Sequence, residues 1–141
     1  MEIINHIAED YAKQFSSPLD AILQEIEDYT LRHHPHAQML SGHVQGKVLE
    51  MISCMIKPQQ ILEIGTFTGF SALCLSKGLQ QNGQLHTIEI REEDAATAKK
   101  YFEKANVKDT IILHLGDARQ IVSTLKQQWD LVFIDADKVS Y

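Results

Sequence analysis

Apolar residues recur at helical spacing over the first third of the chain. Between positions 19 and 29 they fall three or four residues apart, which predicts an amphipathic helix. Ser17 is expected to cap that helix and Pro18 to occupy its first position, while Pro35 ends it by disfavouring helical geometry at the preceding residue. A further helix is predicted from 44 to 56, with one apolar face formed by Val44, Val48, Ile52 and Met55.

From Pro58 onward, short apolar runs alternate with helical patterns. The runs are nearly continuous, which is typical of strands buried on both faces. Strands separated by helices predict right-handed βαβ crossovers and a parallel sheet. The expected fold class is α/β, with a doubly wound, Rossmann-like and mostly parallel sheet of about four strands. The predicted strands are 61–64, 85–90, 111–115 and 131–134, and the predicted helices are 70–79, 92–106 and 119–127.

Length and charge narrow the class of protein further. The 141 residues suffice for one domain, with a helical extension at 1–57 and a Rossmann-like part at 58–141. The net charge of -6 argues against a nucleic-acid partner bound through a broad basic face. We expect a cytoplasmic protein with no membrane partner, because neither a signal-peptide pattern nor a spanning apolar run is found. Cys54 and Cys74 are expected to be reduced and buried.

The residues that follow each predicted strand are where a ligand is expected, because open α/β sheets bind ligands beyond the carboxyl ends of their strands. Gly65 permits a tight turn after the first strand, and Gly69 would let the next helix approach a ligand. Glu89 lies twenty positions after Gly69, where nucleotide-binding folds place an acid for the ribose hydroxyls. Taken alone, Glu89 could equally cap the following helix. Asp117 and Asp135 follow the third and fourth strands.

Two residues of the first loop distinguish between classes of nucleotide. Dinucleotide folds usually have Gly-x-Gly-x-x-Gly, because the second glycine lets the backbone reach a pyrophosphate. Here that position is Phe67, which would obstruct the approach, and the preceding Glu63 would repel phosphate but suit an ammonium group. S-adenosylmethionine carries an amino acid and a sulfonium where dinucleotides carry phosphates. The sequence therefore favours S-adenosylmethionine, and a NAD-binding oxidoreductase stays open as an alternative.

Three segments resemble motifs of the catechol and caffeoyl-CoA O-methyltransferases and their bacterial relatives. Residues 61–71 resemble the cofactor motif of that family. Residues 39–42, followed by Gly46, resemble the segment that lies over the cofactor, and residues 133–138, followed by Tyr141, resemble the metal-site motif. The motifs occur in the family's order. The resemblance implies a class I methyltransferase fold and a metal-assisted O-methyltransferase that uses S-adenosylmethionine to methylate a catechol-like or other phenolic small molecule.

By position, the resemblance also implies roles for individual residues. Glu63, Gly65 and Thr66 would hold the methionine end of the cofactor, and Glu89 would bind its ribose. Asp135 would ligate a divalent cation, Mg²⁺ by preference, and Lys138 would be the base for the acceptor hydroxyl, although without the resemblance Lys138 is better explained as a surface lysine. The implied cofactor-binding set is Ser41, Glu63, Gly65, Thr66, Gly69, Ser71, Glu89, Asp117, Ala118 and Asp135.

Parts of that family's pattern have no counterpart in these 141 residues. The family's sheet has seven strands, and an Asp-Asn pair after the next strand completes its metal site. We therefore expect the chain to be truncated relative to the family and, by itself, to bind S-adenosylmethionine without catalysing transfer. An apolar strand with an open edge invites pairing with another chain, so a homodimer or self-association through the edge of 131–134 is expected.

One further cluster consists of His33, His34 and His36. Two of these histidines are adjacent and Pro35 interrupts the segment, so a solvated loop is favoured over a transition-metal site.

Overall fold

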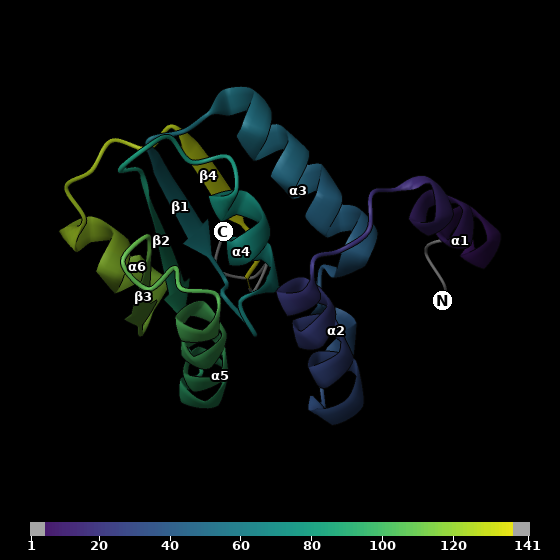
Figure 1. Cartoon of the computed structure of the whole chain (residues 1–141). Helices are drawn as coiled ribbons and strands as arrows, with labels where there is room; N and C mark the ends of the chain where they lie inside the picture. Colours follow the sequence, from purple (N-terminus) through teal and green to yellow (C-terminus); the bar gives the residue numbers. More distant parts are fainter. Residues whose placement is uncertain (1–4, 137–141) are drawn as a thin grey trace.

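Four parallel strands form the centre of the structure, and helices pack on both of their faces (Figure 1). The structure is a computed structural model and describes residues 5–136. No helix in this range is long and apolar enough to cross a membrane. The elements are α1 (His6–Phe15), α2 (Ala21–His33), η1 (Ala37–Met39), α3 (Gly42–Ile56), β1 (Gln60–Ile64), α4 (Phe70–Ser76), β2 (Gln84–Glu89), α5 (Glu92–Lys104), β3 (Ile111–Leu115), α6 (Ala118–Ile121), η2 (Val122–Thr124) and β4 (Leu131–Ile134).

The strand order is β3-β2-β1-β4, and every pairing is parallel. Ile61 of β1 lies opposite Leu85 of β2 on one side and Leu131 of β4 on the other. The chain therefore winds outward from β1 through β2 to β3 and then returns to the far side of β1. This reversal is the topological switch point, where doubly wound sheets bind ligands. The prediction of a doubly wound parallel sheet is confirmed.

One face of the sheet and the helices that cover it enclose the apolar core. Ile61, Leu85 and Ile111 point into this core from three adjacent strands and are at most 3% exposed. Helix α4 contacts β2, α5 contacts both β2 and β3, and α2 and α3 pack against α4. The N-terminal helices add Leu23, Ile26 and Leu49 to the same core. They are therefore packed as part of the α/β unit.

The opposite face of the sheet is covered by α6 and the segment before β4. His86 and His114 stack there, with Nδ1 of the first 2.9 Å from Nε2 of the second, and Trp129 meets His86 edge-on. Desolvation lowers the pKa of both imidazoles. On β4 this face is open, because Val132 and Ile134 are 47% and 49% exposed.

Three predicted helix boundaries are wrong, one of them the end of 70–79, because α4 stops at Ser76. Asp20, not Ser17, is the N-cap of α2, and its carboxylate accepts the Leu23 N–H at 3.0 Å. The helix predicted over 119–127 stops at Ile121 and continues only as η2. The Ser123 and Thr124 hydroxyls donate to carbonyls three residues back, and such side-chain bonds compete with helical geometry.

Helix α3 packs on α4 through small residues and not through its predicted apolar face. A Cβ on Gly46 would lie 2.6 Å from the Phe70 ring, and the Ser53 hydroxyl donates to the Leu75 carbonyl at 2.6 Å. The predicted face points outward, since Met55 is 76% exposed. Cys74 is buried as expected, but Cys54 is exposed, so its predicted burial is wrong. Close approach of the two helices decided which side of α3 is buried.

We propose that two copies of the chain associate through the free edge of β4, which within the described residues pairs with β1 alone. Val132→Lys places a charge on this edge strand. We expect this variant to contain more monomer than the wild type in sedimentation velocity. Met55→Lys is the matched control, because it removes an exposed apolar side chain from α3 without changing the edge. A wild-type chain that stays monomeric at high concentration would contradict the proposal, and a monomer produced only by Met55→Lys would place the contact on α3.

Candidate functional site

A cavity of about 1190 Å³ opens at the carboxyl ends of the strands, beside the switch point. It is slightly larger than the roughly 300–1,000 Å³ of typical small-molecule sites, so it has room for a cofactor and part of a second ligand. Its walls come from the ends of all four strands and from the segment that joins α2 to α3. The predicted site residues that line it are Ser41, Gly65, Thr66, Ser71, Glu89, Asp117, Ala118 and Asp135.

The loop after β1 turns sharply at Gly65, whose φ is +102°. A Cβ at this position would overlap the carbonyl oxygen of Asp135, because the ends of β1 and β4 meet here. The Gly65 and Thr66 N–H groups both donate to the carbonyl of Ile88, at 3.0 and 3.3 Å. These two donors are already engaged, so what this backbone can offer a ligand is carbonyl oxygen, which suits a cation.

Glu63 lies behind the cavity wall and is 0% exposed. Its carboxylate accepts hydrogen bonds from the Ser71 hydroxyl at 2.6 Å and from the Thr87 hydroxyl. Burial, together with the nearby Asp135 and Glu89 carboxylates, raises the pKa of Glu63 to about 7, although the hydrogen bonds from Ser71 and Thr87 oppose this rise. Ser71 stands between this carboxylate and the cavity. Glu63 would therefore act on a positively charged ligand through Ser71.

Glu89 lies at the end of β2, is 7% exposed and lines the cavity. One carboxylate oxygen accepts the N–H groups of Ile90 and Arg91, both at 3.0 Å, and the other accepts the Phe67 N–H at 2.7 Å. Helix α5 begins only after these residues, with Arg91 as its N-cap. Glu89 thus connects the loops after β1 and β2, and the alternative that it caps α5 is not what the structure has.

The helical N-terminal part supplies one wall of the cavity. Met39, Leu40 and Ser41 line it, and they belong to the segment that resembles the family's cofactor cover. This segment is anchored from α2, because the Glu27 carboxylate accepts the His43 N–H at 3.1 Å. The site consequently depends on contacts between α2 and the start of α3 as well as on the strand ends.

Asp117 and Ala118 follow β3 and line the cavity. The Asp117 carboxylate accepts the Arg119 N–H at 2.9 Å as the N-cap of α6, and it also forms an ion pair with the Arg119 guanidinium. These bonds lower the pKa of Asp117. Asp117 is therefore held ionised at the cavity edge, as an acceptor for a polar ligand group.

Asp135 is exposed at the end of β4, and its N–H donates to the Ile64 carbonyl at 2.9 Å. In the range 5–136 no three His, Cys, Asp or Glu side chains are grouped so that they could hold a metal ion. One exposed carboxylate does not fit the octahedral geometry that Mg²⁺ demands. The described residues therefore do not form the implied metal site by themselves. Lys138, the predicted base, lies outside the described residues.

Gly69, predicted to let the following helix approach a ligand, lies against α5 in the structure. Its φ is +92°, and a Cβ would lie 2.8 Å from the Phe102 ring of α5. The missing side chain makes room for α5, and Gly69 is not part of the cavity lining. The lining instead includes Phe67, Arg91 and Asp94, which sequence reasoning did not identify as site residues. An acid in the first turn of a helix usually complements the helix dipole. The position of Asp94 in the sequence therefore did not distinguish a site residue from an ordinary first-turn acid.

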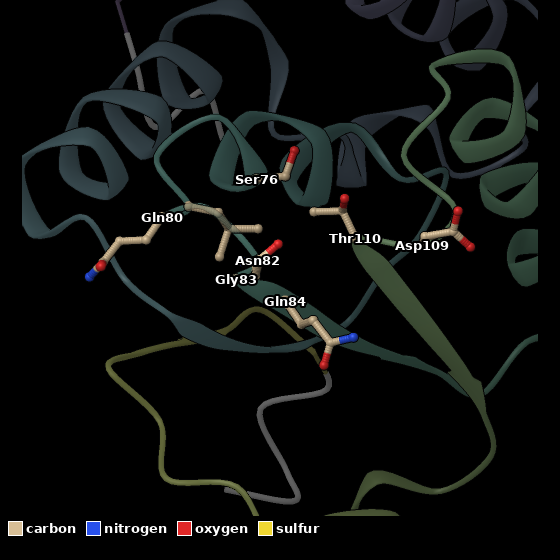
Figure 2. Close-up of a pocket in the computed structure, with 8 residues that line it drawn as sticks. Ser76, Gln80, Asn82, Gly83, Gln84, Asp109 and Thr110 are labelled. Carbon is tan, nitrogen blue, oxygen red and sulfur yellow. The ribbon is translucent and has the colours of Figure 1, made fainter.

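A second hollow, of about 490 Å³, lies at the opposite end of the sheet. Figure 2 shows the residues that line it. The hollow lies where β2 and β3 begin, beside the turn after α4. Its lining contains one ionisable side chain, Asp109, and otherwise amides, hydroxyls, backbone and the apolar side chain of Leu79. This hollow offers no pair of groups for acid–base chemistry, so the cavity at the carboxyl ends remains the candidate site.

Comparisons with known proteins point to one family. A family model described as O-methyltransferase matches residues 13–141. A catechol O-methyltransferase of Niastella koreensis is 34% identical over 101 residues, which are 69% of this chain and 46% of the relative. Caffeoyl-CoA O-methyltransferase 1 of Eucalyptus globulus is 30% identical over 124 residues, 84% of this chain and 50% of the relative. The chain spans about half the length of the curated relatives it matches.

Solved structures give the same result. The methyltransferase PaMTH1 of Podospora anserina, with S-adenosylhomocysteine bound, superposes with a TM-score of 0.90 and 30% identity, covering 98% of this chain and 61% of that one. An O-methyltransferase of Bacillus cereus in complex with S-adenosylhomocysteine superposes with a TM-score of 0.80 and 30% identity, covering 94% and 61%.

Replacing the Glu63 carboxylate by an amide is expected to stabilise the free chain at alkaline pH. The pKa of Glu63 is 4.5 in the unfolded chain and about 7 in the folded chain. Its favourable contribution to the free energy of unfolding is therefore complete below pH 4.5 and is lost as the pH rises from there through 7. Glu63→Gln should therefore match the wild type near pH 5 and exceed it by roughly 1–3 kcal/mol near pH 8, measured by denaturant unfolding. The His86–His114 pair shifts stability the opposite way in this range, but it is common to both proteins and cancels. A variant less stable than the wild type near pH 8 would contradict this account of Glu63.

Proposed function

Because the chain belongs to the O-methyltransferase family, we propose that it binds S-adenosylmethionine in the cavity at the carboxyl ends of its strands. We further propose that it forms part of an enzyme that transfers the methyl group to a phenolic hydroxyl. The observation that carries the proposal is the buried carboxylate of Glu63 behind Ser71, with Glu89 and Asp135 on the same cavity. This arrangement favours a cation with hydroxyl groups and disfavours a pyrophosphate.

Each part of S-adenosylmethionine has a suitable counterpart on the cavity wall. Its ammonium and sulfonium would lie toward Ser71 and the negative charge behind it, close to the Gly65 carbonyl. The ribose hydroxyls would donate to Glu89, a rigid acceptor held by three backbone N–H groups. The adenine would lie toward Asp117 and Ala118.

The charge on the ligand accounts for the unusual state of Glu63. A buried carboxylate that is costly to ionise in the free protein becomes favourable to ionise once a cation lies nearby. Binding of a cationic ligand would then release a proton from Glu63 near neutral pH. The negative charge of ionised Glu63 would attract S-adenosylmethionine more strongly than S-adenosylhomocysteine, in which the sulfur is neutral.

Methyl transfer from a sulfonium to an oxygen is an in-line displacement, so positioning of the two reactants is a large part of the catalysis. A phenol of pKa about 10 must lose its proton before it attacks. The finer proposal is a catechol-like acceptor with assistance from a divalent cation, which would lower the pKa of the acceptor hydroxyl. Its support is the resemblance to catechol and caffeoyl-CoA enzymes and the position of Asp135 at the cavity. The described residues do not by themselves complete a site for such a cation.

Titration of the 141-residue chain with S-adenosylmethionine in a calorimeter tests the cofactor site. We expect binding that weakens about tenfold or more in Glu89→Gln, because the amide loses the ribose acceptor and opposes the Phe67 N–H. Glu93→Gln is the matched control, since Glu93 is exposed on α5 and does not line the cavity. Equal affinities for the wild type and Glu89→Gln, or tighter binding of NADH than of S-adenosylmethionine, would contradict the proposed site.

Turnover is a separate measurement. Mixed with S-adenosylmethionine, catechol and MgCl₂, the 141-residue chain is expected to bind the cofactor without producing S-adenosylhomocysteine. The physical reason is that the residues described here supply one carboxylate for the cation, while the relatives are about twice as long. Mass spectrometry of the mixture checks this. Methylated catechol would contradict the expectation of a binding module and would establish transfer by this chain directly.

A further inference from the structure

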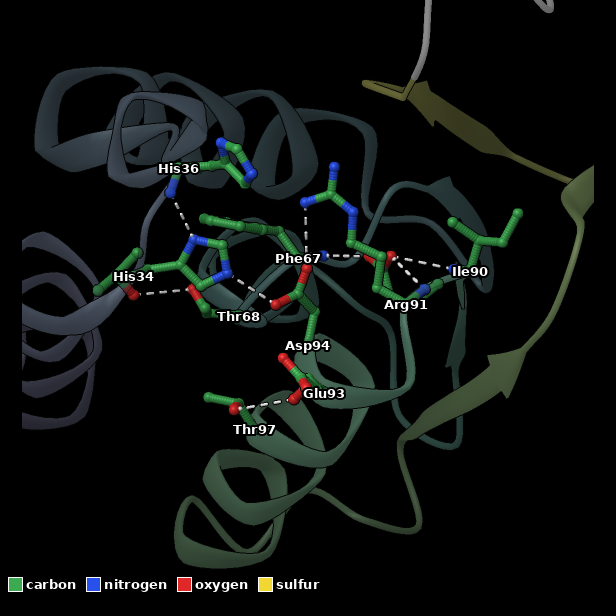
Figure 3. A network of polar contacts seen from close by, with 11 residues as sticks. His34, His36, Phe67, Thr68, Ile90, Arg91, Glu93, Asp94 and Thr97 are labelled. Atoms are coloured by element: carbon green, nitrogen blue, oxygen red, sulfur yellow. Dashed lines mark hydrogen bonds and ion pairs between the residues drawn. The ribbon is translucent and has the colours of Figure 1, made fainter.

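His34 connects the helical N-terminal part to the cavity through a carboxylate. It is the C-cap of α2, and its Nε2 lies 2.8 Å from Oδ1 of Asp94 on α5, sixty positions away in sequence (Figure 3). The Asp94 side chain is 6% exposed and that of His34 is 14% exposed. The prediction of a solvated histidine loop is therefore wrong for His34, although His33 and His36 are exposed as predicted.

The backbone determines which nitrogen of His34 carries a proton. The His36 N–H donates to Nδ1 of His34 at 3.0 Å, so Nδ1 is an acceptor and holds no hydrogen. The hydrogen of the neutral ring must then be on Nε2, where it is donated to Asp94. The interaction is thus directional: the α2 end donates and α5 accepts.

Asp94 depends on this donor. Its second oxygen, Oδ2, is buried without a hydrogen bond, and the nearest cation, the Arg91 guanidinium, is 3.6 Å away. A buried carboxylate that loses its one strong donor is left unsatisfied, which is costly. The pair should therefore be formed nearly all the time, and it fixes the C-terminal end of α2 relative to α5.

Phe67 connects this pair to the cavity. Its φ of +50° is a left-handed conformation that bulky residues rarely adopt, so neighbouring contacts must hold it there. On one side its N–H donates to Glu89 at 2.7 Å. On the other side the His34 ring contacts the Phe67 ring nearly edge-on, with centroids 4.5 Å apart and an interplanar angle of 76° (Figure 3). Phe67, Glu89 and Asp94 all line the cavity.

We infer that His34 and Asp94 are positioning residues that hold two walls of the cofactor cavity together. One wall is the loop at Phe67, and the other is the segment 38–41, which begins four residues after His34 and also lines the cavity. Neither histidine nor aspartate needs to touch the cofactor for this role. The inference rests on the proposed binding of S-adenosylmethionine and names which contact makes that binding depend on the N-terminal helices.

Two amide variants of His34 test the inference. His34→Gln retains a side-chain donor long enough to reach Asp94, whereas the shorter His34→Asn retains an acceptor for the His36 N–H but cannot reach Asp94. We expect His34→Asn to weaken binding of S-adenosylhomocysteine in calorimetry by about tenfold and His34→Gln by at most about threefold. Thr68→Val is the structural control, because it removes the buried Thr30–Thr68 hydrogen bond between α2 and the same loop at a residue outside the cavity lining.

The outcomes separate a positioning role from a purely structural one. If affinity followed the free energy of unfolding in all three variants, including Thr68→Val, or if His34→Asn bound like the wild type, the inference would be overturned. A wild-type chain that binds neither S-adenosylhomocysteine nor S-adenosylmethionine would instead overturn the proposed function. Should His34→Asn not fold, ¹⁵N NMR of the wild-type imidazoles decides: a neutral His34 protonated on Nε2 supports the inference, and protonation on Nδ1 refutes it.

Discussion

Parallel pairing of β1 with both β2 and β4 is the constraint on which the rest of the structure depends. Parallel strands have their carboxyl ends at one edge of the sheet, so the acids that follow them collect in one place. The strand ends also come so close that Gly65 has no space for a side chain beside the Asp135 carbonyl. The tight turn at Gly65, the position of Glu89 and the location of the cavity all follow from this pairing.

The concentration of carboxylates makes the site costly for the free chain. Glu63 is wholly buried, and hydroxyls of Ser71 and Thr87 are its hydrogen-bond donors. An apolar or amide side chain would serve packing better at this position. The proposed cationic ligand would supply the missing positive charge there. Stability and binding thus impose opposite requirements on Glu63, as is common at functional sites.

The N-terminal helices are part of the site as well as part of the core. Leu23 and Ile26 of α2 are buried with the strands, and the segment after α2 forms a cavity wall. Two polar contacts, His34–Asp94 and Thr30–Thr68, join α2 to α5 and to the loop after β1. Because both contacts are largely buried, movement of α2 would disturb Phe67 and the loop that carries it.

The sequence alone determined the α/β class, the four strands and the strand ends at which the cavity lies. Strands buried on both faces appear in the sequence as apolar runs, which identify the strands. The positions at the strand ends, such as Gly65, Glu89 and Asp135, follow from where those runs stop. The tertiary structure alone decided which face of α3 is buried, that Gly69 faces Phe102, and that His34 meets Asp94. The physical reason is that periodicity reports local geometry, whereas these choices depend on the distance of closest approach between elements far apart in the sequence.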